Sequence, residues 1–358
     1  PFLPSGNQLV TNIPNTNGGT GKLFVFTPTF KRAAYLEGQL LDGCTNQPVA
    51  GATVQISGNG TPSTAITDNS GSIKTGIAAS GTFLVTISKA GYITQTKNLN
   101  FTPGEVTDLN ISLERNSAFN VTGKLVNKNT GLSLANTAFS LKSDVQTYQL
   151  QTNASGQFNL TCMFGGNYRV GTWGYLVENA VINSDGNLTI SLQPGYYDDY
   201  ELDLGWTTAA TASAGLWELG EPVGTTLSGN PSNPDLDVPT DNGDQCYVTG
   251  NNGGSVGNDD VDNGSVTLNS PVMKLAASND PVLTFNYWFV NGGGGGNPND
   301  HFEVKVSNGT QTATILNETA SASQWRFSGE IHLKDHIALT DNMRVQFITA
   351  DDAPGHIV

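Results

Sequence analysis

The sequence predicts an all-β protein of several domains, and three observations predict it. Gly (42 residues), Asn, Thr and Ser are abundant while charged residues make up only 13%, a composition typical of short strands joined by many turns. No window carries the i, i+3, i+4, i+7 apolar spacing of an amphipathic helix, whereas apolar and polar residues alternate in many short runs. The length of 358 residues exceeds what one small core organises, so we expect three domains after a lead-in.

The lead-in, residues 1–35, is rich in Pro, Asn, Gly and Thr. Its one strand-like run, KLFVFTPTF, extends from Lys22 to Phe30. We interpret it as the tail of an upstream domain, with an ordered linker as the alternative. Because the chain begins at Pro1 without Met or a signal peptide, we expect a processed product or an excerpt of a longer polypeptide.

An internal repeat with an offset of 85 residues defines the next two domains, at 36–115 and 116–195. The segment EGQLLDGCTNQPVAGATVQIS (Glu37–Ser57) aligns with TGKLVNKNTGLSLANTAFSLK (Thr122–Lys142). Each copy ends on an alternating strand, DLNISL in the first and NLTISL in the second. Two tandem copies of one domain are therefore predicted, each long enough to close one sheet-on-sheet core.

The first copy has the pattern of a small antiparallel sandwich. The run Phe83–Ser88 alternates between apolar and more polar positions, which predicts one buried and one solvent-facing side. The Asp68-Asn69-Ser70-Gly71 cluster predicts a turn between two strands, with positive φ at Gly71.

These motifs resemble the carboxypeptidase regulatory-like, transthyretin-like repeats of many secreted bacterial proteins. The resemblance rests on G-x-L at the first strand, P-V-A-G-A-T-V (Pro48–Val54), T-D-N-S-G (Thr67–Gly71) and K-A-G-Y (Lys89–Tyr92). The second copy departs from it where Trp173-Gly174-Tyr175 replaces K-A-G-Y. The resemblance implies transthyretin-like or Ig-like sandwiches that act as stalks and spacers and carry no chemistry.

The negative charge of the chain belongs to the last predicted domain, residues 196–358. Residues 1–195 hold 11 Lys/Arg against 9 Asp/Glu, whereas residues 196–358 hold 5 against 22. No basic patch compensates elsewhere, so no nucleic-acid partner is expected. Such acidity favours solubility or, more specifically, the binding of divalent cations.

Four runs with period-2 alternation predict strands in this domain, over 281–290, 300–309, 324–333 and 342–350. In the second run, Phe302, Val304 and Val306 face one way and the polar residues between them face the other. A jelly-roll β-sandwich is the expected architecture.

The acidic domain also resembles a jelly-roll domain appended to secreted peptidases and surface proteins of Bacteroidetes-type bacteria. The resemblance rests on the order W-E-x-G-x-P (Trp217–Pro222), C-Y-V-T-G (Cys246–Gly250), D-D-V-D-x-G (Asp259–Gly264) and L-x-S-P (Leu268–Pro271). It implies an extracellular position, type IX secretion, and Ca²⁺ that braces loops at one end of the sandwich. Such domains continue into a further strand, so we expect either truncation at Val358 or a strand supplied by a neighbouring chain.

The residues favour a Ca²⁺ site independently. Asp259, Asp260 and Asp262 place three carboxylates within four positions, and like charges this close repel unless a cation neutralises them. The spacing is not that of an EF-hand, and the alternative is a solvated acidic loop. The other candidate ligands, in the preceding loop and after the last strand, are Asp235, Asp237, Asp241, Asp244, Asp351 and Asp352.

No catalytic constellation is predicted. Gly253–Gly257 matches G-x-S-x-G, but no helix is expected to follow, so Ser255 is not predicted to be a nucleophile. His332 and His336 have the spacing of a helical zinc pair, but on the predicted strand they would lie about 13 Å apart. His301 and His356 stand apart from any partnered acid or base.

The cysteines argue against a domain held together by its own disulfides, and the apolar runs argue against a membrane-inserted protein. Cys44, Cys162 and Cys246 lie one in each predicted domain, so no domain forms its own disulfide, and we expect buried thiols. No apolar run reaches the roughly 18 residues that cross a bilayer, so no membrane insertion is expected.

Together these observations predict a non-catalytic binding, adhesion and spacer segment of a large secreted or cell-surface bacterial protein. Its expected partners are an extracellular polysaccharide, a protein, or neighbouring copies of itself. Trp217, Trp288 and Trp325 are candidates for a sugar-stacking platform, although core packing is the expected role of each. Two alternatives are the non-catalytic C-terminal portion of a secreted zinc peptidase and a building block of an extracellular filament.

Overall fold

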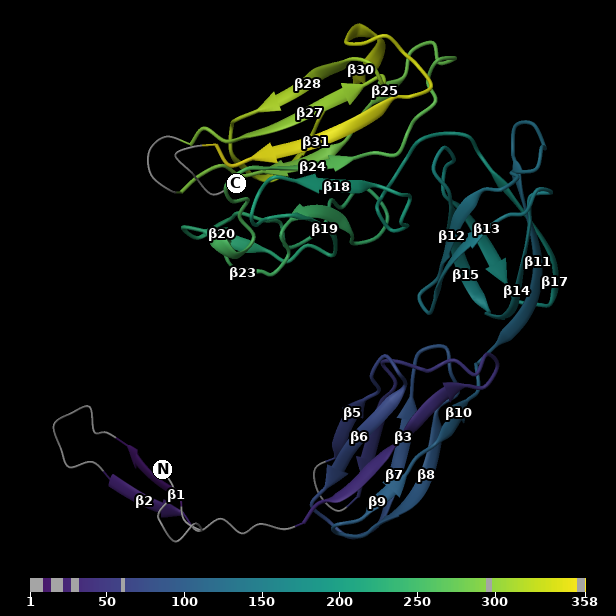
Figure 1. Cartoon of the computed structure of the whole chain (residues 1–358), viewed down its shortest axis with the longest axis vertical. Helices are drawn as coiled ribbons and strands as arrows, with labels where there is room; N and C mark the ends of the chain where they lie inside the picture. Colours follow the sequence, from purple (N-terminus) through teal and green to yellow (C-terminus); the bar gives the residue numbers. More distant parts are fainter. Residues whose placement is uncertain (1–8, 14–21, 27–31, 59–61, 294–297, 353–357) are drawn as a thin grey trace. The chain divides into compact units, whose positions relative to one another are not determined.

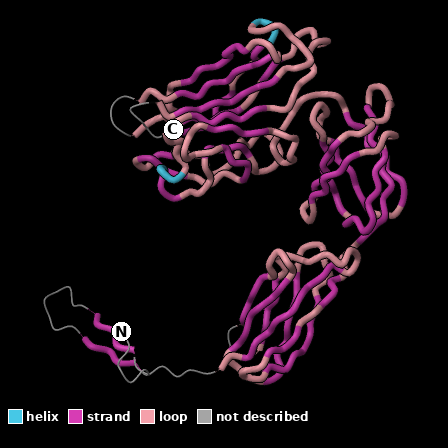
Figure 2. The backbone as a smooth tube through the Cα atoms, in the orientation of Figure 1, coloured by secondary structure: helices cyan, strands magenta, loops and turns pink. Residues whose placement is uncertain are grey.

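The computed structural model describes residues 9–13, 22–26, 32–58, 62–293, 298–352 and 358 (Figure 1). Its regular elements are strands, apart from two short 3-10 helices, η1 (Val256–Asn258) and η2 (Leu333–Asp335), which Figure 2 shows in cyan. The prediction of an all-β fold is confirmed. No helix in the described part of the chain is long and apolar enough to cross a membrane.

The chain forms two compact units, Pro1–Ala118 and Phe119–Val358. Near the start of the first unit, β1 (Leu9–Ile13) and β2 (Lys22–Phe26) pair as antiparallel strands. The strand predicted from Lys22 to Phe30 is thus confirmed over β2, and residues 27–30 lie outside the described residues.

The first sandwich consists of two sheets with the orders β10-β3-β6, with β9 also on β3, and β5-β4-β7-β8. Strand β3 is parallel to β10 and antiparallel to β6. Side chains of both sheets form one core, which includes Leu36, Leu40, Val54, Val85 and Ile87. The strands are β3 (Ala34–Asp42), β4 (Thr53–Ser57), β5 (Ser63–Ile66), β6 (Ser72–Ile77), β7 (Gly81–Ser88), β8 (Gln95–Phe101), β9 (Val106–Asp108) and β10 (Ile111–Leu113).

The local sequence accounts for two features of this sandwich. In β7, Val85 and Ile87 are completely buried whereas Leu84 is 41% exposed, as the alternation predicts. Gly71 has a φ of +71°, and a Cβ there would lie 2.5 Å from the carbonyl oxygen of Leu40. Glycine is therefore required at this turn, both for the backbone conformation and for the close approach.

The second sandwich repeats this arrangement, with sheets in the orders β14-β11-β17 and β13-β12-β15-β16. Strands β11 and β17 are parallel, as β3 and β10 are, and Leu125 on β11 occupies the position of Leu40. The strands are β11 (Ala118–Asn127), β12 (Ala138–Lys142), β13 (Thr147–Gln151), β14 (Gln157–Phe164), β15 (Gly166–Gly171), β16 (Glu178–Ile182) and β17 (Gly186–Leu192).

The repeat extends to individual hydrogen bonds. The hydroxyl of Thr67 donates to a backbone carbonyl at 2.7 Å, and that of Thr152 does so at 2.6 Å. The Oδ1 atoms of Asp68 and Asn153 each accept from the backbone N–H groups two and four residues further on. Residues 85 positions apart in the sequence therefore make equivalent hydrogen bonds in the two sandwiches.

The remainder of the second unit contains one large sheet, in the order β18-β24-β31-β27-β28, and several small ones, β19-β22, β21-β20-β23, β25-β30 and β26-β29. Residues of the large sheet and of β26 share one core, against which Trp217 of β19 and Tyr247 of β22 also pack. This layering is that of a sandwich, and its assignment as a jelly roll stays a prediction. The strands are β18 (Thr207–Ala210), β19 (Trp217–Gly220), β20 (Thr225–Leu227), β21 (Asn230–Pro231), β22 (Cys246–Thr249), β23 (Gly254–Ser255), β24 (Ser265–Asn269), β25 (Val282–Leu283), β26 (Asn286–Phe289), β27 (His301–Ser307), β28 (Thr312–Glu318), β29 (Ala322–Phe327), β30 (Ile331–His332) and β31 (Arg344–Ala350).

Two of the four strands predicted here are interrupted. The runs 281–290 and 324–333 each form two short strands, which pair with each other as β25-β30 and β26-β29. At the break, the Ser328 hydroxyl accepts from the backbone N–H of Phe285, and Gly329 has a φ of +75°. The other two runs form β27 and β31 as predicted, and Phe302, Val304 and Val306 are buried.

The cysteines differ from the expectation of three buried thiols. Cys246 is a buried free thiol, but Cys44 is exposed and Cys162 is only half-buried. Both lie where the chain turns sharply: Cys44 is in the turn after β3, and Cys162 has a φ of +56°. Of the three cysteines, only Cys246, on β22, is buried.

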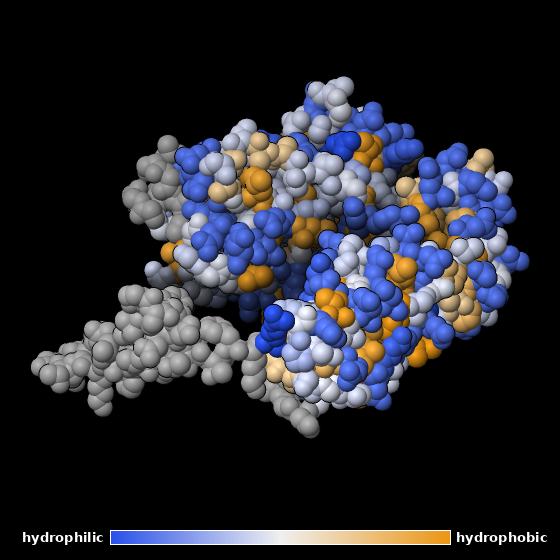
Figure 3. Space-filling view, turned by 60° about the horizontal axis from the view of Figure 1, so that its bottom comes forward, coloured by the Kyte–Doolittle hydropathy of each residue, from blue (hydrophilic) through white to orange (hydrophobic). Residues whose placement is uncertain are grey.

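The face drawn in Figure 3 is mainly hydrophilic. On this face, apolar residues appear as separate patches among polar ones. The largest exposed fractions among apolar side chains of the second unit belong to Leu236 (74%), Leu132 (69%) and Phe327 (61%).

Candidate functional site

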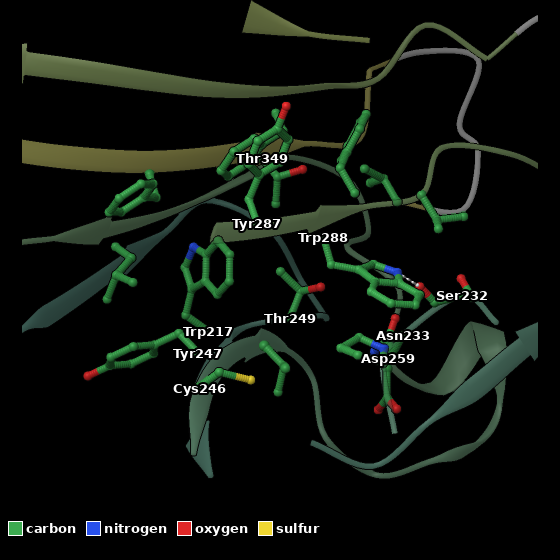
Figure 4. Close-up of a pocket in the computed structure, with 18 of the residues that line it drawn as sticks. Trp217, Ser232, Asn233, Cys246, Tyr247, Thr249, Asp259, Tyr287, Trp288 and Thr349 are labelled. Carbon is green, nitrogen blue, oxygen red and sulfur yellow. Dashed lines mark hydrogen bonds between the residues drawn. The ribbon is translucent and has the colours of Figure 1, made fainter. Parts of the chain in front are cut away.

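A pocket of about 130 Å³ lies among the strands that follow residue 206 (Figure 4). Trp217 of β19, Trp288 of β26 and Trp325 of β29 all line it. These are the three tryptophans that the sequence singles out, and the fold brings them together although they are far apart in the chain. Each is half-buried, so they differ from the expectation of simple core packing, although Trp217 also packs against the core.

Strand pairing places Trp217 at the pocket. Trp217 lies directly opposite Thr249 in the antiparallel β19-β22 pair, so both side chains project from the same face. In Figure 4, Thr249 lies between the rings of Trp217 and Trp288. Trp288 is at a bulge in the β26-β29 pair, between Tyr287 and Phe289, and such irregularities redirect side chains.

The three indole N–H groups differ in their partners. Trp288 Nε1 donates to the carbonyl oxygen of Ser232 at 2.5 Å, and Trp325 Nε1 donates to that of Leu236 at 3.0 Å. Trp217 Nε1 is buried and has no hydrogen-bond partner within the described structure. Because a buried donor without an acceptor costs about 1–3 kcal/mol, this N–H is the polar group of the pocket most in need of a ligand atom.

Other polar side chains complete the walls. Asn233, Thr249 and Thr349 line the same pocket as the tryptophans. Tyr287 and Phe302 also line the pocket, and their rings stack at a centroid distance of 5.3 Å. The arrangement of aromatic walls and few polar groups is typical of sites for small molecules.

A group of carboxylates lies where the loop after η1 meets the end of β31. The pKa of Asp260 is raised to about 6, mainly by burial and in part by the nearby negative charges of Asp262, Asp351 and Asp300. Asp260 Oδ1 accepts from the backbone N–H of Val358 at 2.7 Å. Three of the predicted ligands, Asp260, Asp262 and Asp351, are thus brought together, along with Asp300, which the sequence analysis does not include.

Asp351 is held in this group by one of its two carboxylate oxygens. Its Oδ2 accepts from the backbone N–H of Asn263 at 2.8 Å, while Oδ1 is buried with no hydrogen-bond partner in the described structure. Even so, no group of three or more His, Cys, Asp or Glu side chains is arranged to hold a metal within the described residues.

The other predicted ligands lie elsewhere. The carboxylate of Asp259 is buried and accepts from Asn252 and Gly253, so it braces its own loop. Asp235 accepts from the backbone N–H of Gly224. The backbone N–H of Asp244 donates to Glu201.

Asp237 and Asp241 form a separate pair. The pKa of Asp237 is raised to about 6, mainly by burial and in part by repulsion from Asp241. Sequence proximity alone suggests one acidic loop, but the fold divides its carboxylates among different environments.

The structure gives the surroundings of Ser255 and of three of the four histidines. Ser255 ends β23 and is followed by a single 3-10 turn instead of an α-helix. His332 lies 3.0 Å from Asp280, whereas His336 follows η2, so the prediction of one continuous strand here is wrong. His301 is not isolated, because its Nδ1 lies 2.9 Å from Asp352 Oδ2. His356 lies outside the described residues.

Comparison with known proteins gives one family match, which covers part of the chain. The model of the carboxypeptidase regulatory-like domain family matches residues 35–114, which form the first sandwich. None of the curated proteins matches the sequence.

Several solved structures show a low similarity to the chain. The Streptococcal ancillary pilin is 14% identical and covers 53% of this chain and 76% of its own, with a TM-score of 0.26. The Bacillus anthracis TIE protein is 11% identical and covers 91% of this chain and 51% of its own, with a TM-score of 0.26. The shaft pilin SpaA from Lactobacillus rhamnosus GG is 12% identical and covers 47% of this chain and 100% of its own, with a TM-score of 0.28. Such similarity assigns no function, and the first sandwich, residues 35–114, is the part of the chain that matches a carboxypeptidase regulatory-like domain.

Proposed function

We propose that the chain is a non-catalytic binding and spacer segment of a secreted or cell-surface bacterial protein. In this proposal the two sandwiches are spacers, and the pocket of Trp217, Trp288 and Trp325 is the recognition site. Its ligand is a sugar ring of an extracellular polysaccharide. The observation that carries the proposal is the convergence of the three tryptophans around one buried, unpartnered indole N–H.

The chemistry of the pocket fits a sugar better than a purely apolar ligand. Aromatic faces stack against the C–H faces of pyranose rings, and the unpartnered N–H of Trp217 supplies a donor for a ring hydroxyl. Thr249, Thr349 and Asn233 supply further donors and acceptors at the same pocket. A purely apolar ligand would leave these groups unsatisfied, which is costly in a buried site.

The test is glycan-array screening followed by calorimetric titration of the whole chain. Trp217→Phe keeps an aromatic ring and removes the N–H, so we expect affinity for the selected oligosaccharide to fall about tenfold. Trp217→Ala should abolish detectable binding. Trp173→Phe, which removes an indole that does not line this pocket, should bind like the wild type. The proposal fails if Trp217→Ala binds as tightly as the wild type or if no glycan binds.

We also propose that Ca²⁺ braces the carboxylate group of Asp260, Asp262 and Asp351. The chemistry of these carboxylates supports the proposal, because they repel one another and Asp351 Oδ1 has no hydrogen-bond donor in the described structure, although their arrangement there is not that of a metal site. Backbone oxygens and water would supply the remaining ligands, as they commonly do for this ion. The role of the metal in this proposal is structural.

Calorimetry with and without Ca²⁺ tests this second proposal. Saturation at one hundred times the dissociation constant stabilises a protein by about 2.7 kcal/mol, so Tm of the second unit should rise by about 5–10 °C. Asp260→Asn should abolish the rise, whereas Asp335→Asn, a charge change at an exposed position on η2, should leave it unchanged. Identical melting in EDTA and in Ca²⁺ would contradict the proposal.

A further inference from the structure

A second cavity, of about 360 Å³, has a different chemistry from the tryptophan pocket. Its aromatic walls include Trp206, Tyr200, Phe285 and Phe347, which form a continuous series of ring contacts. Three carboxylates, of Asp198, Asp237 and Asp241, line it as well. We call it the acid-aromatic cavity.

Two carboxylate oxygens in this cavity need a donor. Asp237 Oδ2 and Asp241 Oδ1 are both buried and have no hydrogen-bond partner in the described structure. The third carboxylate differs, because Asp198 accepts from the backbone N–H of Tyr200 and from Trp206 Nε1, each at 2.8 Å. Asp237 Oδ1 accepts from the backbone N–H of Val238 at 2.7 Å, so Asp237 Oδ2 and Asp241 Oδ1 are the acceptors left open to a ligand.

No protein cation is available to them. None of the described residues that line the cavity is Lys, Arg or His. Arg169, whose charge affects Asp241, pairs with Asp199, and Lys142 Nζ lies 2.7 Å from Glu201. The described walls of the cavity therefore carry carboxylates and no cation. Burial raises the pKa of both Asp237 and Asp241; the charge of Asp241 contributes to the rise at Asp237, and that of Asp199 to the rise at Asp241, where Arg169 opposes it.

We infer that the acid-aromatic cavity binds an organic cation, an alkylammonium or alkylguanidinium whose charged group lies at Asp237 and Asp241 and whose stem packs on the aromatic walls. Aromatic faces attract cations, most strongly where water is excluded. A bare metal ion fits less well, because rings and aliphatic side chains that make up most of the walls supply no ligand oxygens. A cavity of about 150 Å³ accommodates a benzene-sized ligand, so this one has room for a longer organic cation.

The entrance is formed by exposed apolar side chains. Tyr196, Tyr197, Val282 and Phe327 line the cavity and are 37%, 43%, 42% and 61% exposed. A ligand can therefore enter from solvent, either as a free small cation or as the side chain of a Lys or Arg on another protein. A free cation and a protein side chain would present the same charged group, and the experiment below distinguishes between them.

The test titrates the full chain by calorimetry with agmatine, with the peptide acetyl-Gly-Arg-Gly-amide, and with the neutral alcohol isopentanol. Agmatine or the peptide should bind, and isopentanol should not. Tighter binding of agmatine identifies a free small cation as the source, and tighter binding of the peptide identifies a protein side chain. If neither cation binds, or if isopentanol binds equally well, the inference is overturned.

Variants distinguish this cavity from the acidic surface as a whole. The double variant Asp237→Asn with Asp241→Asn keeps side-chain size and should weaken cation binding at least tenfold. Asp335→Asn, which removes one charge from an exposed site, should bind like the wild type. Phe327→Ala changes only the exposed entrance and should weaken binding while the chain stays folded. Unchanged affinity in both the double variant and Phe327→Ala would overturn the inference. Trp325, Phe285 and Phe347 line both cavities, but neither Asp237 nor Asp241 lines the tryptophan pocket, so the double variant should leave glycan binding unchanged.

Discussion

The clearest difference between the two repeats at the level of single residues is at Asp42 and its equivalent, Asn127. Both Oδ1 atoms accept from the backbone N–H groups two and three residues further on. Asp42 Oδ2 also accepts from Tyr92 at 2.6 Å and from Arg115 at 2.7 Å. In the second copy the residue at the position of Arg115 is Pro194, and the neutral Asn127 accompanies it. The second copy thus lacks both the carboxylate of Asp42 and its partner, the guanidinium of Arg115.

Asp42→Asn should destabilise the first sandwich in a pH-dependent way. Burial opposes ionisation, but the hydrogen bonds from Tyr92, Arg115 and the backbone outweigh it and lower the pKa of Asp42 to about 2. Since the folded pKa is below the unfolded one, the stabilisation of about 2 kcal/mol is present above pH 4 and is lost as the pH falls toward 2. Urea unfolding followed by circular dichroism at pH 7 and pH 2.5 should show a large difference between variant and wild type only at pH 7.

The second copy provides the matched control. Asn127→Asp places a carboxylate where no Arg is available, so this variant should destabilise the second sandwich. All five tryptophans follow residue 118, so their fluorescence reports on the second unit alone. Fluorescence should therefore detect Asn127→Asp and not Asp42→Asn. An equal effect of Asp42→Asn at both pH values would contradict this account.

At the level of elements, the turn between β15 and β16 explains why the second copy departs from the K-A-G-Y motif. Tyr92 and Tyr175 close equivalent turns, which places Trp173 at the position of Ala90. Trp173 Nε1 donates to the carbonyl oxygen of Val272 at 2.9 Å, and its ring contacts Trp206. The departure from the motif thus joins the second sandwich to the strands that follow it within one compact unit.

Trp173→Ala should weaken this connection. Loss of a large aromatic side chain at a packed contact costs about 3 kcal/mol, so the second sandwich and the strands after residue 206 should unfold at separate temperatures. Differential scanning calorimetry would show an additional transition. Trp173→Phe, which keeps the ring contact but not the N–H, should have a smaller effect. A thermogram of Trp173→Ala with the wild-type transitions would refute the proposed role.

At the level of the whole molecule, the first sandwich has a core of its own. Its hydrophobic cluster contains only residues between Ala34 and Leu113. A fragment of residues 32–118 should therefore fold alone and unfold cooperatively. Amide chemical shifts that match those of the whole chain would support this. A fragment with the narrow shift dispersion of an unfolded chain would contradict it.

The sequence predicts most of the fold because strand alternation and turn chemistry are local. Period-2 alternation gives the buried face of β7 and β27, and the D-N-S-G cluster gives the glycine turn. The same reasoning fails at the β25/β26 and β29/β30 breaks, where the interruption depends on hydrogen bonds between segments more than 40 residues apart. Sequence patterns also cannot show which of several neighbouring aspartates share one group of carboxylates in the fold.

The sequence by itself determined the all-β class, the tandem repeat and the concentration of negative charge after residue 195, because each depends on the order and spacing of residues. Only the tertiary structure decided that Trp217, Trp288 and Trp325 meet at one pocket, and that Asp260 and Asp237 belong to different groups of carboxylates. The physical reason is that a site depends on distances between side chains from separate strands. Those distances are set by strand pairing and sheet packing, which no local pattern specifies.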